Sequence, residues 1–186
     1  MVALLFDLAY AVALVVVAAD LVGREKGVLA DSKNDRGSTA VVAVAVVCSF
    51  VSLPLLASTS FSTVQWGFLG LVGLAMMAAG IAVRVWARAV LGRYYSLSLK
   101  TASGQSLVDK GPYARVRHPG YSGYLLMWFG LAVASTSGLA ILLIAALMGP
   151  AYAYRIRNEE AMLAVSLGVP YQQYMKRTKR LVPFVY

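Results

Sequence analysis

The chain has 186 residues, of which 60% are hydrophobic and only 13% are charged, and its formal net charge is +9. Soluble domains are about 45–50% apolar and about 25% charged, so this composition indicates an integral membrane protein of one domain. The basic excess then indicates an anionic membrane face as a partner and argues against nucleic acid. One cysteine and one histidine exclude a disulfide framework and leave almost no means of building a zinc site.

Five segments are apolar and close enough in length to the roughly 20 residues of a bilayer span to predict membrane helices. They are residues 3–22, 39–57, 66–90, 121–135 and 138–154. The last two are joined only by Thr136 and Ser137, which predicts a tight helical hairpin. Pro54 and Pro150 fall within these segments and are expected to kink or end their helices.

The first apolar segment differs from a secretory signal, because no Lys or Arg occurs before Arg24. We therefore interpret it as a first membrane helix rather than a cleaved leader. Nearly all basic residues fall in the segments after the first, third and fifth helices, whereas the connections 58–65 and 136–137 have none. The positive-inside rule then predicts an N-terminus outside and a C-terminus in the cytoplasm. The predicted fold is an all-α integral membrane domain, residues 1–186, with about five transmembrane helices.

Two of the predicted cytoplasmic segments are too long to be turns, namely residues 91–120 and the tail 155–186. The tail continues with helical spacing of apolar residues, for which Gly168 is a suitable C-cap and Pro170 a suitable stop. The segment 31–38 is polar and is interpreted as a connection only.

The only histidine, His118, lies between Arg117 and Pro119, where a cytoplasmic loop meets the fourth apolar segment. A lone histidine is commonly structural, but a helix start offers free N–H groups and a partial positive charge that suit a carboxylate or phosphate. Pro119 fits the first helical turn, and Gly120 and Gly123 are expected to let a ligand approach the backbone. This context favours a ligand-binding role.

Arg155, Glu159 and Glu160 follow the fifth apolar segment. On a continuing helix Arg155 and Glu159 are four residues apart and share one face. One interpretation is a solvated, weakly stabilising ion pair. The other is a site in which Glu159 holds the cationic amine of a ligand while Arg155 binds an anionic substrate group as a planar fork. Spacing alone leaves both open.

Other residues have a simpler interpretation. The aromatic and basic tail 171–183 indicates anchoring at the membrane interface. Arg84 lies at membrane depth in the third segment, where an ionisable group is expected to face protein or a cavity. Gly67, Gly70 and Gly73 are predicted to be helix-packing positions rather than a nucleotide loop.

Several short motifs follow one another in the second half of the chain. They comprise Leu107, Val108, Gly111-Pro112-Tyr113, Arg117-His118-Pro119-x-Tyr121-x-Gly123, Arg155-x3-Glu159-Glu160, Gly168-x2-Tyr171-x2-Tyr174 and Arg180-Leu181-x-Pro183. In order, spacing and membrane context this set resembles the isoprenylcysteine carboxyl methyltransferase family, in its small prokaryotic form. The resemblance covers residues 90–186, which we expect to be the catalytic half, whereas the helices within 1–65 carry no motif and are expected to vary.

The resemblance implies S-adenosylmethionine as cofactor, in a cytoplasmic pocket formed by the loop before the fourth helix and the tail after the fifth. The residues it implies for cofactor binding are Gln105, Ser106, Leu107, Val108, Tyr113, His118, Pro119, Gly120, Tyr121 and Glu159. It associates Arg155 with substrate, so Arg155 and Glu159 are the catalytic candidates; from the composition, no metal is expected. Gly120 stands where the family usually has a bulkier residue.

Methyl transfer from a sulfonium is an in-line displacement that demands positioning and electrostatics. A carboxylate acceptor is already a nucleophile and needs no general base. We therefore expect a methyltransferase of a prokaryotic inner or plasma membrane that acts on a lipophilic or lipidated acceptor, most simply a carboxylate such as that of a prenylcysteine-like substrate. Membrane lipids are the other expected partners, and the oligomeric state is open.

Two alternatives are retained. A phospholipid or amine N-methyltransferase would have to deprotonate its acceptor, and Glu160 could serve as the base. An NADPH-dependent membrane lipid or steroid reductase could use Arg115, Arg117 and Arg157 to bind the 2′-phosphate. The pattern Arg117-His118-Pro119-x-Tyr121 argues for the methyltransferase.

Overall fold

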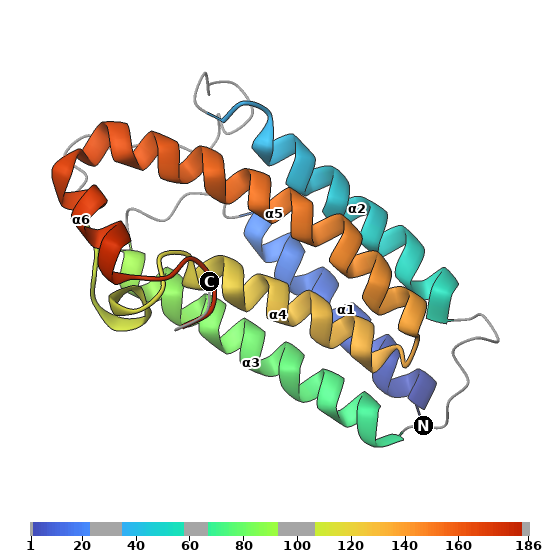
Figure 1. Ribbon diagram of the computed structural model, residues 1–186. Coiled ribbons are helices and arrows are strands. Elements are labelled where there is room, and N and C mark those ends of the chain that lie inside the picture. The colour runs from blue at the N-terminus through green and yellow to red at the C-terminus, as the bar shows by residue number, and fades with distance from the viewer. Residues whose placement is uncertain (1, 23–34, 58–66, 93–106, 184–186) are drawn as a thin grey trace.

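The computed structural model describes residues 2–22, 35–57, 67–92 and 107–183. Its elements are α1 (Val2–Val22), α2 (Ser38–Ala57), α3 (Gly67–Leu91), the 3-10 turn η3 (Gly111–Ala114), α4 (Pro119–Ala134), α5 (Gly138–Leu167) and α6 (Val169–Arg177). Figure 1 shows α1 to α5 as an elongated bundle, with α6 turned across one end of it beside the start of α4. Within the described residues the only strand-like pairing is one isolated bridge, so the predicted all-α fold is confirmed.

Three of the described helices, α2, α3 and α5, are long and apolar enough to cross a membrane. The outer face of α2 exposes Val44, Val47 and Val51, which suits contact with lipid. The chain is thus a multi-pass membrane protein, as predicted. Helix α4 has 16 residues, and the apolar stretch Phe6–Ala19 of α1 is also shorter than a full span. The count of five spans and their orientation stay predictions.

Helix α5 runs from Gly138 to Leu167, so the apolar segment 138–154 and the helical tail predicted after it form one continuous helix. At 1.5 Å per residue its 30 residues extend about 45 Å, against about 30 Å of hydrocarbon. Neither Pro150 in α5 nor Pro54 in α2 ends its helix. The last turns of α5 therefore carry its charged residues beyond its apolar part on one continuous helix.

The turn after α5 is partly as predicted. Gly168 caps the helix with φ of +59°, a left-handed value that glycine adopts at little cost. Pro170 was expected as a stop, and α5 does end before it, at Leu167; Pro170 itself lies in the first turn of α6. A proline there loses nothing, because the first helical N–H groups have no partner within the helix.

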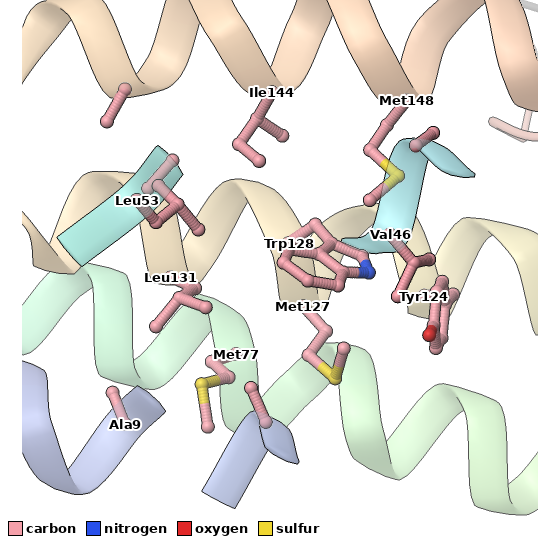
Figure 2. Packing of buried hydrophobic residues seen from close by; sticks show 14 of the residues in the cluster. Ala9, Val46, Leu53, Met77, Tyr124, Met127, Trp128, Leu131, Ile144 and Met148 are labelled. Atoms are coloured by element: carbon pink, nitrogen blue, oxygen red, sulfur yellow. The ribbon is translucent and has the colours of Figure 1, made fainter. Parts of the chain in front are cut away.

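The α4–α5 hairpin is as tight as predicted. Ser137 caps the start of α5 by accepting a hydrogen bond from the Ala140 N–H, and Thr136 adopts a left-handed φ of +54° in the turn. The core surrounds α4, with side chains from α2 and α5 on one side of it and from α1 and α3 on the other, as Figure 2 shows. Its largest fully buried side chains include Trp128, Met127, Leu131, Ile144, Met148 and Leu53.

Helices α3 and α4 run antiparallel with their backbones in close contact at two levels. A Cβ on Gly80 would come within 2.5 Å of the Gly123 carbonyl oxygen, and one on Gly73 within 2.6 Å of the Gly130 oxygen. In each helix the two glycines are seven residues apart, a period that keeps one stripe against a partner crossing at a small left-handed angle. Small residues permit this approach in membranes, where dispersion contacts and weak hydrogen bonds hold helices together.

The predicted roles of the glycines are therefore only partly right. Gly73 is a packing position, whereas Gly70 has open space around it, and the surroundings of Gly67 lie outside the described part. Gly123 was expected to admit a ligand and instead packs on the backbone of α3 at Gly80 and Arg84. The expectation was wrong because a glycine signals close approach without revealing what approaches.

We expect Gly80→Ala to lower the stability of the detergent-solubilised protein by about 1–3 kcal/mol, the usual cost of overpacking. Its Cβ would meet helix backbone, which cannot rotate away as a side chain can. Gly70→Ala, on the same helix but with nothing within 4 Å, is the matched control and is expected to have little effect. Thermal unfolding of both variants checks this, and equal midpoints would contradict the packing argument.

Candidate active site

The loop before α4 and the tail after α6 are joined by backbone hydrogen bonds. Val116 forms a parallel bridge with Lys179. The Arg117 N–H donates to the Lys179 carbonyl at 2.7 Å, and the His118 N–H donates to the Arg180 carbonyl at 3.0 Å. These bonds bring together the two segments that were predicted to form the cofactor pocket. The pocket itself stays a prediction.

Glu160 on α5 forms ion pairs with both the loop and the tail. Its carboxylate accepts hydrogen bonds from Arg117 Nε at 2.8 Å and from Arg180 Nε at 3.0 Å. Arg117 also donates to the backbone carbonyl of Thr178, and His118 Nε2 lies 3.4 Å from Glu160 Oε1. Both carboxylate oxygens of Glu160 are thus engaged by cations on the loop and the tail. This arrangement argues against Glu160 as a general base.

Glu159, the neighbouring carboxylate, has different surroundings. It accepts a hydrogen bond from the Tyr121 hydroxyl at 2.7 Å, and His118 Nδ1 lies 3.7 Å from the same oxygen. The His118 ring stacks on the Tyr121 ring, with centroids 5.5 Å apart and planes 9° from parallel. The Glu159 side chain is 23% exposed, whereas that of Glu160 is 9% exposed. Of the two, Glu159 is the carboxylate open to a ligand.

Arg155 lies one turn before Glu159 and its side chain is buried. Its Nε donates to the Tyr121 hydroxyl at 3.2 Å. Its Nη1 donates to oxygens of Asp35 at 2.7 Å, Ser38 at 3.1 Å and Thr39 at 2.6 Å. The segment 31–38 is therefore more than a connection where it is described, from Asp35 onward. Residues 31–34 lie outside the described part.

Arg84 braces the first turn of α4. It is 7% exposed, its Nη1 donates to the Gly120 carbonyl at 3.3 Å, and its guanidinium lies 4.3 Å from the centre of the Tyr124 ring. The prediction that Arg84 faces protein is confirmed. By engaging the Gly120 carbonyl, Arg84 helps to position the turn that carries Tyr121.

The other predicted cofactor residues that the structure describes lie in η3, at the start of α4 and in the connection before η3. Tyr113 is buried in η3, and its carbonyl accepts a hydrogen bond from the Tyr174 hydroxyl at 2.7 Å. Pro119 is the buried first residue of α4. Leu107 and Val108 are half-buried in the connection before η3. Gln105 and Ser106 lie outside the described residues. Cofactor contacts for all of these stay predictions.

Near the carboxylate pair, the buried Tyr171 Oη has no hydrogen-bond partner within the described residues, whereas the buried His118 Nε2 faces Glu160 Oε1 at 3.4 Å. Such atoms are costly to bury unless a ligand or water satisfies them. Burial, together with the charges of Glu159 and Glu160, raises the pKa of the Tyr171 phenol, so it stays a neutral donor. The tail tyrosines Tyr171 and Tyr174 were expected to anchor at the membrane interface, and this is wrong, because both are buried within the protein.

The fold and the site define a multi-pass, all-helical membrane protein in which ion pairs join α5 to the loop before α4, to the tail and to the turn before α2. The model of the isoprenylcysteine carboxyl methyltransferase (ICMT) family matches residues 72–165. The chain belongs to this family. The matched segment contains His118, Tyr121, Arg155 and Glu159, whereas Asp35 lies outside it.

Plant relatives extend the comparison. The chain is 28% identical over 123 residues to a probable protein-S-isoprenylcysteine O-methyltransferase of Oryza sativa subsp. indica, an alignment covering 65% of this chain and 64% of the relative. It is 31% identical over 115 residues to protein-S-isoprenylcysteine O-methyltransferase B of Arabidopsis thaliana, covering 61% of this chain and 58% of the relative. The chain thus spans less than two thirds of the length of either relative.

One solved structure shares the fold. It is a eukaryotic intramembrane Ras methyltransferase of the isoprenylcysteine carboxyl type, determined without a monobody. The two structures superpose with a TM-score of 0.60 at 24% sequence identity, over 77% of this chain and 52% of the other. The likeness shows that the helical arrangement is that of the family.

Proposed function

We propose that the chain is a membrane methyltransferase that uses S-adenosylmethionine to methylate the carboxylate of a lipophilic acceptor of the prenylcysteine class. The observation that carries the proposal is Glu159, a partly exposed carboxylate in a largely buried cluster, oriented by Tyr121 and His118. Membership of the family supports methyl transfer as the reaction.

The donor set around Glu159 fits S-adenosylmethionine. This cofactor supplies a methyl group on a positively charged sulfur, and its amino-acid end carries an ammonium and a carboxylate. Glu159 would hold a cationic group, because a carboxylate at a partly buried site attracts cations strongly. Tyr171 Oη, buried without a partner among the described residues, would donate to an oxygen or nitrogen of the same molecule.

The surroundings of Glu160 favour a carboxylate acceptor over an amine. An amine must lose a proton before it attacks, and Glu160 is engaged by Arg117 and Arg180. A carboxylate acceptor needs no base. Arg155 remains our proposed partner for such an anionic group, because its guanidinium lies beside Tyr121 and Glu159. Its contact with substrate is a proposal from the family pattern.

The reductase alternative has less support. Of the three arginines that were considered for a 2′-phosphate, Arg117 is engaged by Glu160 and by tail carbonyls. Arg115 and Arg157 are exposed. The positions of Arg115, Arg117 and Arg157 therefore give no support for a shared phosphate site.

Calorimetric titration of the detergent-purified chain with S-adenosylhomocysteine and, separately, with NADPH tests the cofactor. We expect saturable binding of S-adenosylhomocysteine and no binding of NADPH; the reverse would overturn the proposal. A methyl-transfer assay then compares a prenylated cysteine with a free carboxyl, its methyl ester and phosphatidylethanolamine. Methylation of the free acid alone is expected, whereas methylation of phosphatidylethanolamine would reassign the acceptor to an amine.

A further inference from the structure

Four side chains from distant parts of the sequence form a continuous path of hydrogen bonds that ends on Glu159. Asp35, just before α2, pairs with Arg155 Nη1 at 2.7 Å. Arg155 Nε donates to the Tyr121 hydroxyl at 3.2 Å, and this hydroxyl donates to Glu159 Oε2 at 2.7 Å. The path thus runs from a carboxylate through a guanidinium and a phenol to a second carboxylate. Asp35 and Arg155 are 120 residues apart in the chain.

The path fixes the direction of the Tyr121 hydroxyl. A phenol has one proton to donate and an oxygen that accepts. The Tyr121 oxygen accepts a hydrogen bond from Arg155 Nε–H, so the hydroxyl proton is directed to Glu159. Arg155 therefore acts on Glu159 through Tyr121, in addition to any contact with substrate.

Asp35 holds Arg155 in this arrangement. Its carboxylate is 6% exposed and also accepts hydrogen bonds from the Ser38 hydroxyl at 2.6 Å and the Thr39 N–H at 3.1 Å. Burial would raise the pKa of Asp35, but the hydrogen bonds from Ser38 and Thr39 and the charge of Arg155 outweigh it and lower the pKa. Asp35 is thus a fixed negative charge, anchored to the first turn of α2.

The charge of Asp35 also affects how strongly Arg155 neutralises Glu159. Arg155 and Glu159 are four residues apart on α5, a spacing at which opposite charges attract. Pairing with Asp35 compensates the guanidinium and directs Nη1 toward α2. Without Asp35, less of the guanidinium charge would be compensated beside α2, and more of it would act on Glu159, which would then attract a cationic ligand less.

We infer that Asp35 is a positioning residue of the active site, which orients Tyr121 through Arg155 and leaves the charge of Glu159 to a cationic ligand. The inference rests on the proposed function, since that ligand is the cofactor. It adds to the site a residue outside the family segment 72–165. The N-terminal part of the chain then contributes to binding and is more than a variable anchor.

The test is titration of Asp35→Asn with S-adenosylhomocysteine in the absence of acceptor. We expect binding about fivefold weaker than in the parent chain, at the lower end of couplings between linked groups. Asp35→Glu is expected to recover part of the loss. Asp7→Asn, which alters an exposed carboxylate on α1, is the matched control and is expected to bind as the parent does.

A double-mutant cycle with Tyr121→Phe separates positioning from a structural effect. In the Tyr121→Phe background Asp35→Asn is expected to cause no further loss of affinity, because the path is already interrupted; additive losses would overturn the inference. If Asp35→Asn fails to fold, Thr39→Val takes its place, since Thr39 accepts from Arg155 Nη1 at 2.6 Å. A smaller loss, absent in the Tyr121→Phe background, is then expected, and unchanged affinity would overturn the inference.

The parent chain distinguishes the two proposals. If the parent fails to bind S-adenosylhomocysteine, the proposed function fails and the inference fails with it. If the parent binds and Asp35→Asn binds equally well, the inference alone is overturned and the proposed function is unaffected.

Discussion

Glu159→Gln is expected to weaken binding of S-adenosylmethionine by roughly 30-fold while leaving the fold intact. Glutamine keeps the length of the side chain and a carbonyl oxygen that can accept the Tyr121 hydroxyl bond. What it removes is the negative charge, and a hydrogen bond to a charged group contributes about 1.5–3 kcal/mol. Calorimetric titration of the variant in detergent measures the loss, with the midpoint of thermal unfolding as the control for folding.

Comparing two ligands shows which cationic group Glu159 holds. S-adenosylmethionine has a sulfonium charge that S-adenosylhomocysteine lacks, whereas both have the ammonium. An equal loss for the two ligands assigns Glu159 to the ammonium, and a greater loss for S-adenosylmethionine assigns it to the sulfonium. Undiminished binding of both ligands by a folded variant would remove Glu159 from the site.

The helices could be predicted from sequence because membrane spans are long apolar runs. Hydropathy falls at Arg155, so the end of α5 was indicated by a different signal, namely the helical spacing of apolar residues up to the Gly168 cap. The α3–α4 contact did leave a signal that was missed. Gly73 and Gly80, like Gly123 and Gly130, are seven residues apart, and such a period marks one helix face.

The site was predictable where its residues are near neighbours in sequence. Arg155 and Glu159 are four residues apart on α5, so helix geometry alone places them together, and His118 immediately precedes the first turn of α4, which carries Tyr121. The Asp35–Arg155 pair gave no such signal, because its partners are 120 residues apart. Ser38 and Thr39, which follow Asp35, are hydroxyl residues typical of a helix start. They do not indicate that this turn binds Arg155.

The adjacent carboxylates Glu159 and Glu160 show why spacing alone did not decide their roles. One residue on a helix is a rotation of about 100°. That rotation directs Glu160 to the loop and tail arginines and Glu159 to Tyr121. The sequence shows only that two carboxylates are adjacent. Which of them is paired with arginines depends on how the loop before α4 and the tail pack against α5.

Glu160→Gln is therefore expected to destabilise the protein instead of affecting ligand binding directly. Arg117 is buried against Glu160 and would be left with its charge uncompensated, and Arg180 would lose its partner on α5. Removing one member of a buried ion pair costs about 3–5 kcal/mol. We expect a clear fall in the midpoint of thermal unfolding, against little change in Glu159→Gln.

The tail should detach before the bundle unfolds, because Glu160 joins Arg180 to the loop that carries Arg117 and His118. Limited proteolysis in detergent is expected to cleave Glu160→Gln within the tail at protease concentrations that leave the parent chain intact. Asp109→Asn is a suitable control, since it breaks an ion pair with Arg177 that is half exposed and contributes little. A Glu160→Gln variant as stable and as resistant as Asp109→Asn would show that backbone pairing alone holds the tail.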